Sequence, residues 1–122
     1  MPIIITRTVK IVIFSFLLLS TILLLIQKSY AKDISKSIEN GQKKAAVCAA
    51  CHGVNGNSVN PEWPSLANQS VKYMVEQLQH FKSGVRKNVL MSSQATNLST
   101  EDMIDLSNYC LLYTSPSPRD LR

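Results

Sequence analysis

The sequence predicts an all-α domain preceded by an apolar N-terminal helix. Apolar residues recur at helical spacing in segments beyond residue 32, and no segment alternates apolar and polar residues for long enough to form a convincing strand. The long stretches between these segments are rich in Gly, Asn, Ser and Pro or lack periodicity. A chain of 122 residues suffices for one small domain built in this way.

The N-terminal region has the composition of an export signal. Basic residues precede an uncharged apolar run at 11–26, and small residues with the spacing of a signal-peptidase site follow it. We therefore expect residues 1–31 to be a signal peptide. The alternative is an uncleaved membrane anchor, although a spanning helix needs about 20 apolar residues. The basic residues are Arg7 and Lys10, and the small ones are Ser29 and Ala31.

The C-terminal residues are expected not to be native. Codons for Cys110 to Asp120 can be chosen so that they spell the transposase adapter used to prepare sequencing libraries. We therefore expect residues 110–122 to be translated adapter and exclude them from the fold. The native domain would then cover residues 32–109 and be truncated at its end. A natural Ser- and Pro-rich tail is the alternative.

The net charge of +5 comes mainly from the two terminal segments. Residues 32–109 contain eight basic and seven acidic residues, a net charge of +1. Nucleic-acid-binding domains carry a strongly basic surface instead. We therefore expect no nucleic-acid partner.

The first expected helix covers residues 35–47 and contains Gly41 in its interior. A glycine there costs about 1 kcal/mol relative to alanine. Such a residue is favoured where another backbone comes close, so we expect a close approach at Gly41.

Two further helices are expected at residues 71–83 and 100–109. The first follows the N-cap Ser70, ends before Gly84 and has one apolar stripe. The second follows the N-cap Ser99 and has acidic residues in its first turn. The stripe consists of Val71, Met74, Val75, Leu78 and Phe81, and the inward residues of the last helix are Met103, Ile104 and Leu106. Residues 53–69 and 85–97 are expected to be loops.

The segment from Cys48 to His52 reads CAACH and carries the chemistry. A thioredoxin-like dithiol opens a helix in a βαβ unit, and no strand is expected here. A zinc site needs four ligands, and His80 is the only other histidine. The pattern C-x-x-C-H is the attachment site of a c-type haem, in which two thiols form thioethers with the haem vinyl groups and the histidine binds iron. Covalent haem is the favoured interpretation, and a haem-free dithiol stays open.

A haem iron with a methionine as its sixth ligand is typical of electron transfer. Met74 and Met103 lie on apolar helical positions and are expected in the core. Met91 lies in the expected loop at 85–97, where no helical packing explains it. Met91 is therefore the expected axial ligand, and His80 is expected to be a half-exposed helix residue.

The stretch from Gly41 to Tyr109, including ACHGVNGNSVNPEWPSLANQ, resembles class I cytochrome c, in particular a single haem domain of the cytochrome c4 and c553 type. The resemblance implies a compact fold of about three main helices and long loops around one haem, with Gly41 packed against Tyr109 where the first and last helices cross. It implies that the haem-binding residues are Cys48, Cys51, the proximal ligand His52, the distal ligand Met91 and Pro64, whose carbonyl orients the proximal imidazole.

The same resemblance implies a periplasmic one-electron carrier that is not itself an enzyme. Its expected partners are redox proteins, such as a quinol-oxidising complex, a terminal oxidase or other periplasmic cytochromes. Membrane association is expected only if the N-terminal helix is retained. The alternative is a haem module of a larger multihaem protein, such as a dihaem cytochrome, a peroxidase or a dehydrogenase subunit.

Overall fold

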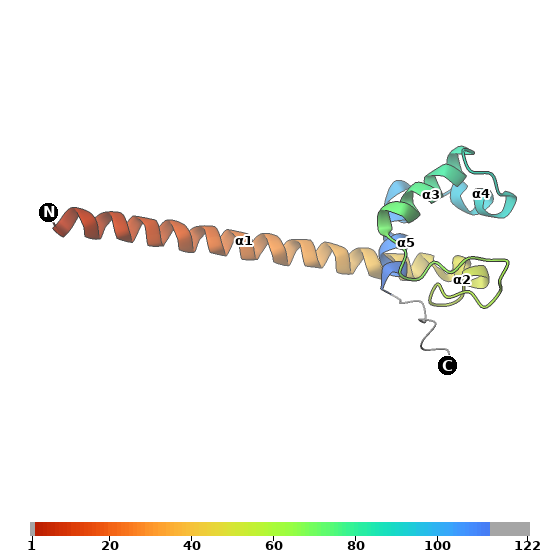
Figure 1. Ribbon diagram of the computed structural model, residues 1–122, viewed down its shortest axis with the longest axis horizontal. Helices are drawn as coiled ribbons and strands as arrows, with labels where there is room; N and C mark the ends of the chain where they lie inside the picture. Colours follow the sequence, from red (N-terminus) through yellow and green to blue (C-terminus); the bar gives the residue numbers. More distant parts are fainter. Residues whose placement is uncertain (1, 113–122) are drawn as a thin grey trace. The chain divides into compact units, whose positions relative to one another are not determined.

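The computed structural model describes residues 2–112, with side chains from Val9 onward, and it is helical without strands over this range. The all-α prediction is therefore confirmed. Figure 1 shows the order of the helices along the chain, which are α1 (Pro2–Lys44), α2 (Ala46–His52), α3 (Val71–Ser83), α4 (Val89–Thr96) and α5 (Thr100–Leu111).

The chain divides into two units, Met1–Ile34 and Ser35–Arg122. The first unit is the N-terminal part of α1, whose apolar side chains are exposed. The candidate span Val9–Lys44 contains an 18-residue window of mean hydropathy 2.7, so α1 is long and apolar enough to cross a membrane. A signal sequence at this position has the same character, so cleavage or retention of residues 1–31 stays a prediction.

The second unit is organised around the crossing of the last turns of α1 with α5. A Cβ atom built on Gly41 would lie 2.0 Å from the carbonyl oxygen of Asp105 and 2.8 Å from the Cβ of Tyr109. No side chain fits in that space. The expected close approach at Gly41 is therefore confirmed, and it brings the two helices into backbone contact.

The core joins this crossing to α3. The largest buried cluster consists of Ala45, Met74, Leu106, Tyr109 and Cys110. Met103 is 1% exposed, so both methionines expected in the core are buried. Ile104 was expected to pack inward, and this prediction is wrong because its side chain lies at the edge of the buried face of α5 and is 41% exposed.

The predicted boundaries of α3 are confirmed, and those of α5 are correct at its start. The Ser70 hydroxyl accepts a hydrogen bond from the Tyr73 N–H, and Gly84 ends α3 in the left-handed conformation at φ +78°. Ser99 and Asp102 form a capping box at the start of α5. Helix α5 continues to Leu111, two residues beyond the expected end.

Two local predictions are wrong. The expected end of the first helix at Val47 is wrong. Helix α1 ends at Lys44, a turn at Ala45 follows, and α2 continues to His52. The hydrogen bond from the Ala49 N–H to the Ala45 carbonyl links the turn to α2. The stretch at 85–97 is not only loop, because residues 89–96 form α4. Eight residues give about two turns, which is too short for a readable apolar period.

The expected adapter segment lies mostly outside the described residues, which end at residue 112. Within the described part, Cys110 and Leu111 complete α5, and Cys110 is buried against the core. The non-native origin of residues 110–122 stays a prediction.

A charged cluster stabilises the crossing of α1 with α5. The Lys44 ammonium lies 2.7 Å from Asp102 Oδ1 and 2.8 Å from Asp105 Oδ2. The Asp105 carboxylate is 4% exposed and also accepts a 2.6 Å hydrogen bond from the Ser37 hydroxyl. Asn108 donates in turn to Ser37. The buried charge is therefore compensated by both an ion pair and hydrogen bonds.

These contacts shift the pKa values of all three charged groups. Hydrogen bonds from Lys44 and then Ser99 hold the pKa of the Asp102 carboxyl well below its ordinary value. Burial raises the pKa of the Asp105 carboxyl, but hydrogen bonds from Lys44 and Ser37 outweigh it and leave that pKa lowered. Hydrogen bonds to Asp102 and Asp105 raise the pKa of Lys44 to about 12. The cluster therefore stabilises the fold between about pH 4 and pH 10, and its contribution is lost as the pH falls through the lowered carboxyl values or rises through about 12.

We expect Asp105→Asn to lower the free energy of unfolding by about 1.5–3 kcal/mol at pH 7, the range for hydrogen bonds to charged groups. The loss should shrink as the pH falls below about 4, because the wild-type carboxyl is then increasingly protonated. Urea unfolding over a pH series measures the difference. The matched control is Glu39→Gln, since the pair of Glu39 with Lys43 is exposed to solvent and should contribute little to stability. A difference between wild type and Asp105→Asn that is the same at every pH would contradict the prediction.

Candidate functional site

Helix α2 presents the two thiols and the imidazole of the CAACH segment together. Cys48 and Cys51 are three residues apart, so they lie on neighbouring positions of one helix face. His52 is the last helical residue and is 7% exposed. Helix α2 ends there because Gly53 adopts φ +83°, and a Cβ at that position would lie 2.0 Å from the Asn57 carbonyl oxygen.

The loop at residues 53–69 folds back against α2. The Gly56 carbonyl accepts hydrogen bonds from the N–H groups of Leu66 and Ala67, at 2.7 and 3.0 Å, and these bonds close the loop. The Ser58 hydroxyl donates to the Cys51 carbonyl at the end of α2, at 3.3 Å. A loop of this length is therefore ordered by its own backbone, and it brings residues near 64 beside His52.

The His52 imidazole is oriented by the loop. Its Nδ1 lies 2.7 Å from the carbonyl oxygen of Pro64. A carbonyl oxygen only accepts hydrogen bonds, so Nδ1 carries the proton and Nε2 has the free lone pair. Nδ1 is therefore occupied by the Pro64 carbonyl, and Nε2 is the ring nitrogen that remains to bind a metal.

The thiol of Cys48 is not activated. Burial, and secondarily the neighbouring Cys51, raise the pKa of Cys48 above its ordinary value. A nucleophilic dithiol needs a lowered pKa at its reactive cysteine. The described part of the chain also contains no strand that could build a βαβ unit. Both observations disfavour the dithiol interpretation.

A zinc site is also disfavoured. Over the described residues, no three or more His, Cys, Asp and Glu side chains gather as metal ligands. The three cysteines of this range are free thiols. A structural zinc ion would need four such ligands.

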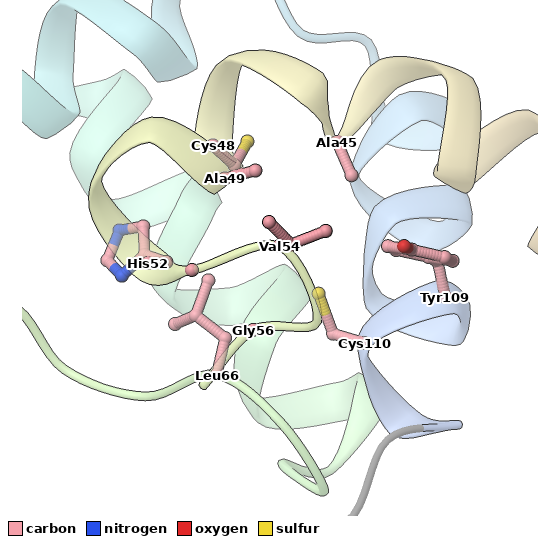
Figure 2. A pocket seen from close by; sticks show the side chains of 10 residues that line it. Ala45, Cys48, Ala49, His52, Val54, Gly56, Leu66, Tyr109 and Cys110 are labelled. Atoms are coloured by element: carbon pink, nitrogen blue, oxygen red, sulfur yellow. The ribbon is translucent and has the colours of Figure 1, made fainter. Parts of the chain in front are cut away.

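A small hollow lies between α2 and α5. Figure 2 shows Cys48, Val54, Tyr109 and Cys110 around it, with the His52 imidazole directed away from Tyr109. Its volume is about 10 Å³, about the space that one water molecule needs. The hollow is therefore a small gap in the packing.

The remaining predicted site residue, Met91, lies on a different element. It is the third residue of α4 and is half-buried. Helix α4 packs against α3, and Figure 1 shows α4 and α2 on the same side of the unit, one above the other. Helix α2 and the loop after it bring Cys48, Cys51, His52 and Pro64 together, whereas Met91 lies on a separate helix. His80 is half-buried on α3, as expected.

Sequence reasoning missed one residue that contacts Met91, namely Asn88, the N-cap residue of α4. The Asn88 side-chain oxygen accepts a 2.9 Å hydrogen bond from the Met91 N–H and caps α4. Asparagine is a favoured N-cap residue. The asparagine at position 88 is therefore the feature of the sequence that indicates the start of α4.

Comparisons with known proteins point to one family. A sequence model described as cytochrome c matches residues 38–111. The chain is 46% identical over 69 residues to cytochrome c4 of Pseudomonas aeruginosa, covering 57% of this chain and 34% of the relative. It is 36% identical over 72 residues to cytochrome c-554(548) of Halomonas halodenitrificans, covering 57% of this chain and 87% of the relative. The crystal structure of reduced recombinant cytochrome c4 from Pseudomonas stutzeri superimposes with a TM-score of 0.61 at 39% identity, over 64% of this chain and 46% of that chain. The chain thus spans about a third to a half of the cytochrome c4 proteins that it matches.

The residues of the site fit a covalently bound haem. Two thiols share one face of α2, and next to them lies an imidazole whose proton is on Nδ1, so that Nε2 is the nitrogen left to bind a metal. The small core also leaves several apolar side chains exposed to solvent. The most exposed of these in the second unit are Val54, Val59, Val85, Val89 and Leu90.

Proposed function

Because this chain belongs to the cytochrome c family, we propose that it is a one-electron carrier. Its cofactor is one haem c, attached covalently through Cys48 and Cys51. When bound, the haem iron supplies a centre that exchanges one electron between its ferrous and ferric states. We assign His52 as the proximal ligand and Met91 as the distal ligand.

The chain's own residues prepare this site in three ways. The Pro64 carbonyl holds the proton on Nδ1 of His52, which keeps the Nε2 lone pair available and restricts rotation of the ring. Cys48 and Cys51 would hold the haem through two thioethers, each formed by addition of a thiol S–H across one vinyl group. The loop at 53–69 covers the His52 side of the site, since His52 is buried beneath it.

The observation that carries the proposal is the contact of His52 with Pro64. The Pro64 carbonyl holds the proton on Nδ1 and leaves Nε2 as the nitrogen that can bind iron, directly beside two free thiols on the same helix. This arrangement fits a permanent axial ligand.

A redox titration tests the proposal. The holoprotein should follow a one-electron Nernst curve reversibly, and its reduced form should not bind carbon monoxide, because both axial positions are filled. Rapid carbon monoxide binding by the reduced wild-type protein would instead indicate an open iron and an enzyme or sensor.

We expect Met91→Ala to abolish the weak sulfur-to-iron absorption band of the oxidised protein and to permit carbon monoxide binding when reduced. Without the Met91 side chain, water would occupy the sixth coordination position of the iron, and exogenous ligands displace water easily. Absorption spectra of both oxidation states measure the change. Met74→Leu is the matched control, since Met74 is 7% exposed in the core and a similar apolar volume preserves packing. Retention of the band in Met91→Ala would exclude Met91 as the ligand.

A second candidate function is that of a haem module in a longer multihaem protein. It is favoured by the length comparison, because the chain spans 34% of the cytochrome c4 of Pseudomonas aeruginosa. One relative, from Thiomonas intermedia, is described as a thiosulfate dehydrogenase electron acceptor, at 40% identity over 68 residues. The genomic sequence that follows the codon of Tyr109 distinguishes the two candidates, since a second C-x-x-C-H motif is required by the multihaem alternative.

We further propose that the protein acts in the periplasm and exchanges electrons with respiratory complexes, such as a quinol-oxidising complex and a terminal oxidase. Removal of residues 1–31 is compatible with the fold, because the side chains of residues 9–36 are exposed to solvent. The mass of the protein isolated from the producing cell distinguishes a cleaved signal peptide from a retained anchor.

A further inference from the structure

We propose that Asn88 is a positioning residue that holds Met91 in place for iron ligation. This inference rests on the proposed function, in which the Met91 sulfur is the distal ligand. The Asn88 side-chain oxygen accepts a hydrogen bond of 2.9 Å from the Met91 N–H. The Asn88 carbonyl accepts a second one of 2.8 Å from the Ser92 N–H. The amides on both sides of the Met91 α-carbon are therefore tied to one residue.

Helix α4 depends on this cap more than a long helix would. It has eight residues, and isolated helices of fewer than about 12–15 residues are marginal in water. Its first two residues, Val89 and Leu90, are exposed, and the residue that anchors it in the core is Ala95, which is fully buried near the other end. The first turn, which carries Met91, is therefore held chiefly by Asn88.

Asn88 is itself connected to the core through Arg86. The Arg86 N–H donates to the His80 carbonyl at 3.0 Å, and its guanidinium donates to Gln77 Oε1 at 2.7 Å. The same guanidinium lies 4.6 Å from the centre of the ring of Phe81, which is buried in α3. The loop before α4 is thus fixed on α3 two residues before the cap.

The other end of α4 is tied to the same helix. The Lys82 ammonium donates a hydrogen bond to the carbonyl of Leu98, two residues past the end of α4. Helix α3 therefore supports α4 at both ends, with Arg86 before it and Lys82 after it. Asn88 is the link in this arrangement that contacts the backbone of Met91 directly.

Removal of the cap should favour the state in which Met91 is detached from iron. Losing an asparagine N-cap shifts a local folding equilibrium by about fivefold. An exogenous ligand such as imidazole competes with the Met91 sulfur, so its apparent affinity reports the population of the detached state.

The experiment titrates imidazole into the oxidised, full-length holoprotein and its variants. We expect Asn88→Ala to tighten apparent imidazole binding about fivefold and to weaken the sulfur-to-iron band. Asn88→Asp keeps an acceptor oxygen at the cap and should retain the wild-type affinity within about twofold.

The matched control is Ser99→Ala, which removes the N-cap of α5, a helix without a ligand. The Ser99 hydroxyl accepts a 3.0 Å hydrogen bond from the Asp102 N–H, so the loss of stability is comparable, and urea unfolding of both variants verifies this. Imidazole affinity should not change in Ser99→Ala. Unchanged affinity in Asn88→Ala, or an equal shift in Ser99→Ala, would overturn the inference.

The outcomes also separate this inference from the proposed function. Loss of the sulfur-to-iron band in Met91→Ala, together with wild-type imidazole affinity in Asn88→Ala, removes only the positioning role. Retention of the band in Met91→Ala removes the ligand assignment itself, whatever Asn88→Ala does.

Discussion

Replacing both Cys48 and Cys51 by alanine is expected to leave a protein whose haem is extracted completely by acidified acetone. Each thioether is a carbon–sulfur bond that survives unfolding in acid, whereas an axial bond to His52 is lost when the imidazole is protonated. Without either thioether, only contacts that acid abolishes would retain the haem. The measurement is the haem absorbance that remains with the precipitated polypeptide, and wild type should retain nearly all of it.

The third cysteine provides the matched control for this prediction. Cys110 is a free thiol like the other two, and it is buried on α5 beside the same hollow as Cys48. Cys110→Ala should keep the haem on the polypeptide, because position 110 is not part of the C-x-x-C-H motif. Haem that resists extraction in the double variant, or that becomes extractable in Cys110→Ala, would assign the attachment to other residues.

Gly41→Ala is expected to lower the free energy of unfolding by about 3 kcal/mol, or to prevent folding altogether. The added Cβ would lie 2.0 Å from the carbonyl oxygen of Asp105, a backbone atom that moves only if α5 moves with it. Overpacking of this kind costs about 1–3 kcal/mol, and more when backbone has to shift. Urea unfolding measures the loss. The sign is diagnostic, because alanine would otherwise stabilise a helix interior by about 1 kcal/mol relative to glycine.

The same substitution at Gly84 is the control. Gly84 has φ +78°, but no atom lies within 4 Å of the Cβ position. Gly84→Ala therefore introduces left-handed strain without a clash and should cost about 1–2 kcal/mol. If Gly41→Ala proved neutral or stabilising, the backbone contact between α1 and α5 would be ruled out in solution.

The parts of the structure that sequence predicted well depend on neighbouring residues. Ser70 and Gly84 delimit α3 because a cap and a left-handed terminus are decided by the residues at those positions. Met74 and Phe81 are buried because a stripe at helical spacing faces the core.

The predictions that failed concern elements whose order comes from distant contacts. Helix α4 has too few residues for a pattern and is held by Asn88, by the buried Ala95 and by links from α3. Ile104 has an apolar side chain like a core residue, but its position on α5 leaves it 41% exposed. Apart from the N-cap residue Asn88, neither outcome is encoded in a short window of sequence.

The sequence by itself determined the helical class and the chemistry of the CAACH segment. These follow from periodicity and from the spacing of reactive side chains, which are properties of adjacent residues. A glycine inside an expected helix also predicted a close approach at position 41. Only the tertiary structure decided which atoms meet across the fold. The Asp105 carbonyl oxygen occupies the space beside Gly41, and the Pro64 carbonyl selects the tautomer of His52. The Asn88 side chain accepts the hydrogen bond from the Met91 N–H, and hydrogen bonds to or from α3 fix the chain before and after α4. Contacts between residues far apart in sequence depend on how helices pack, and packing is settled by the whole domain at once.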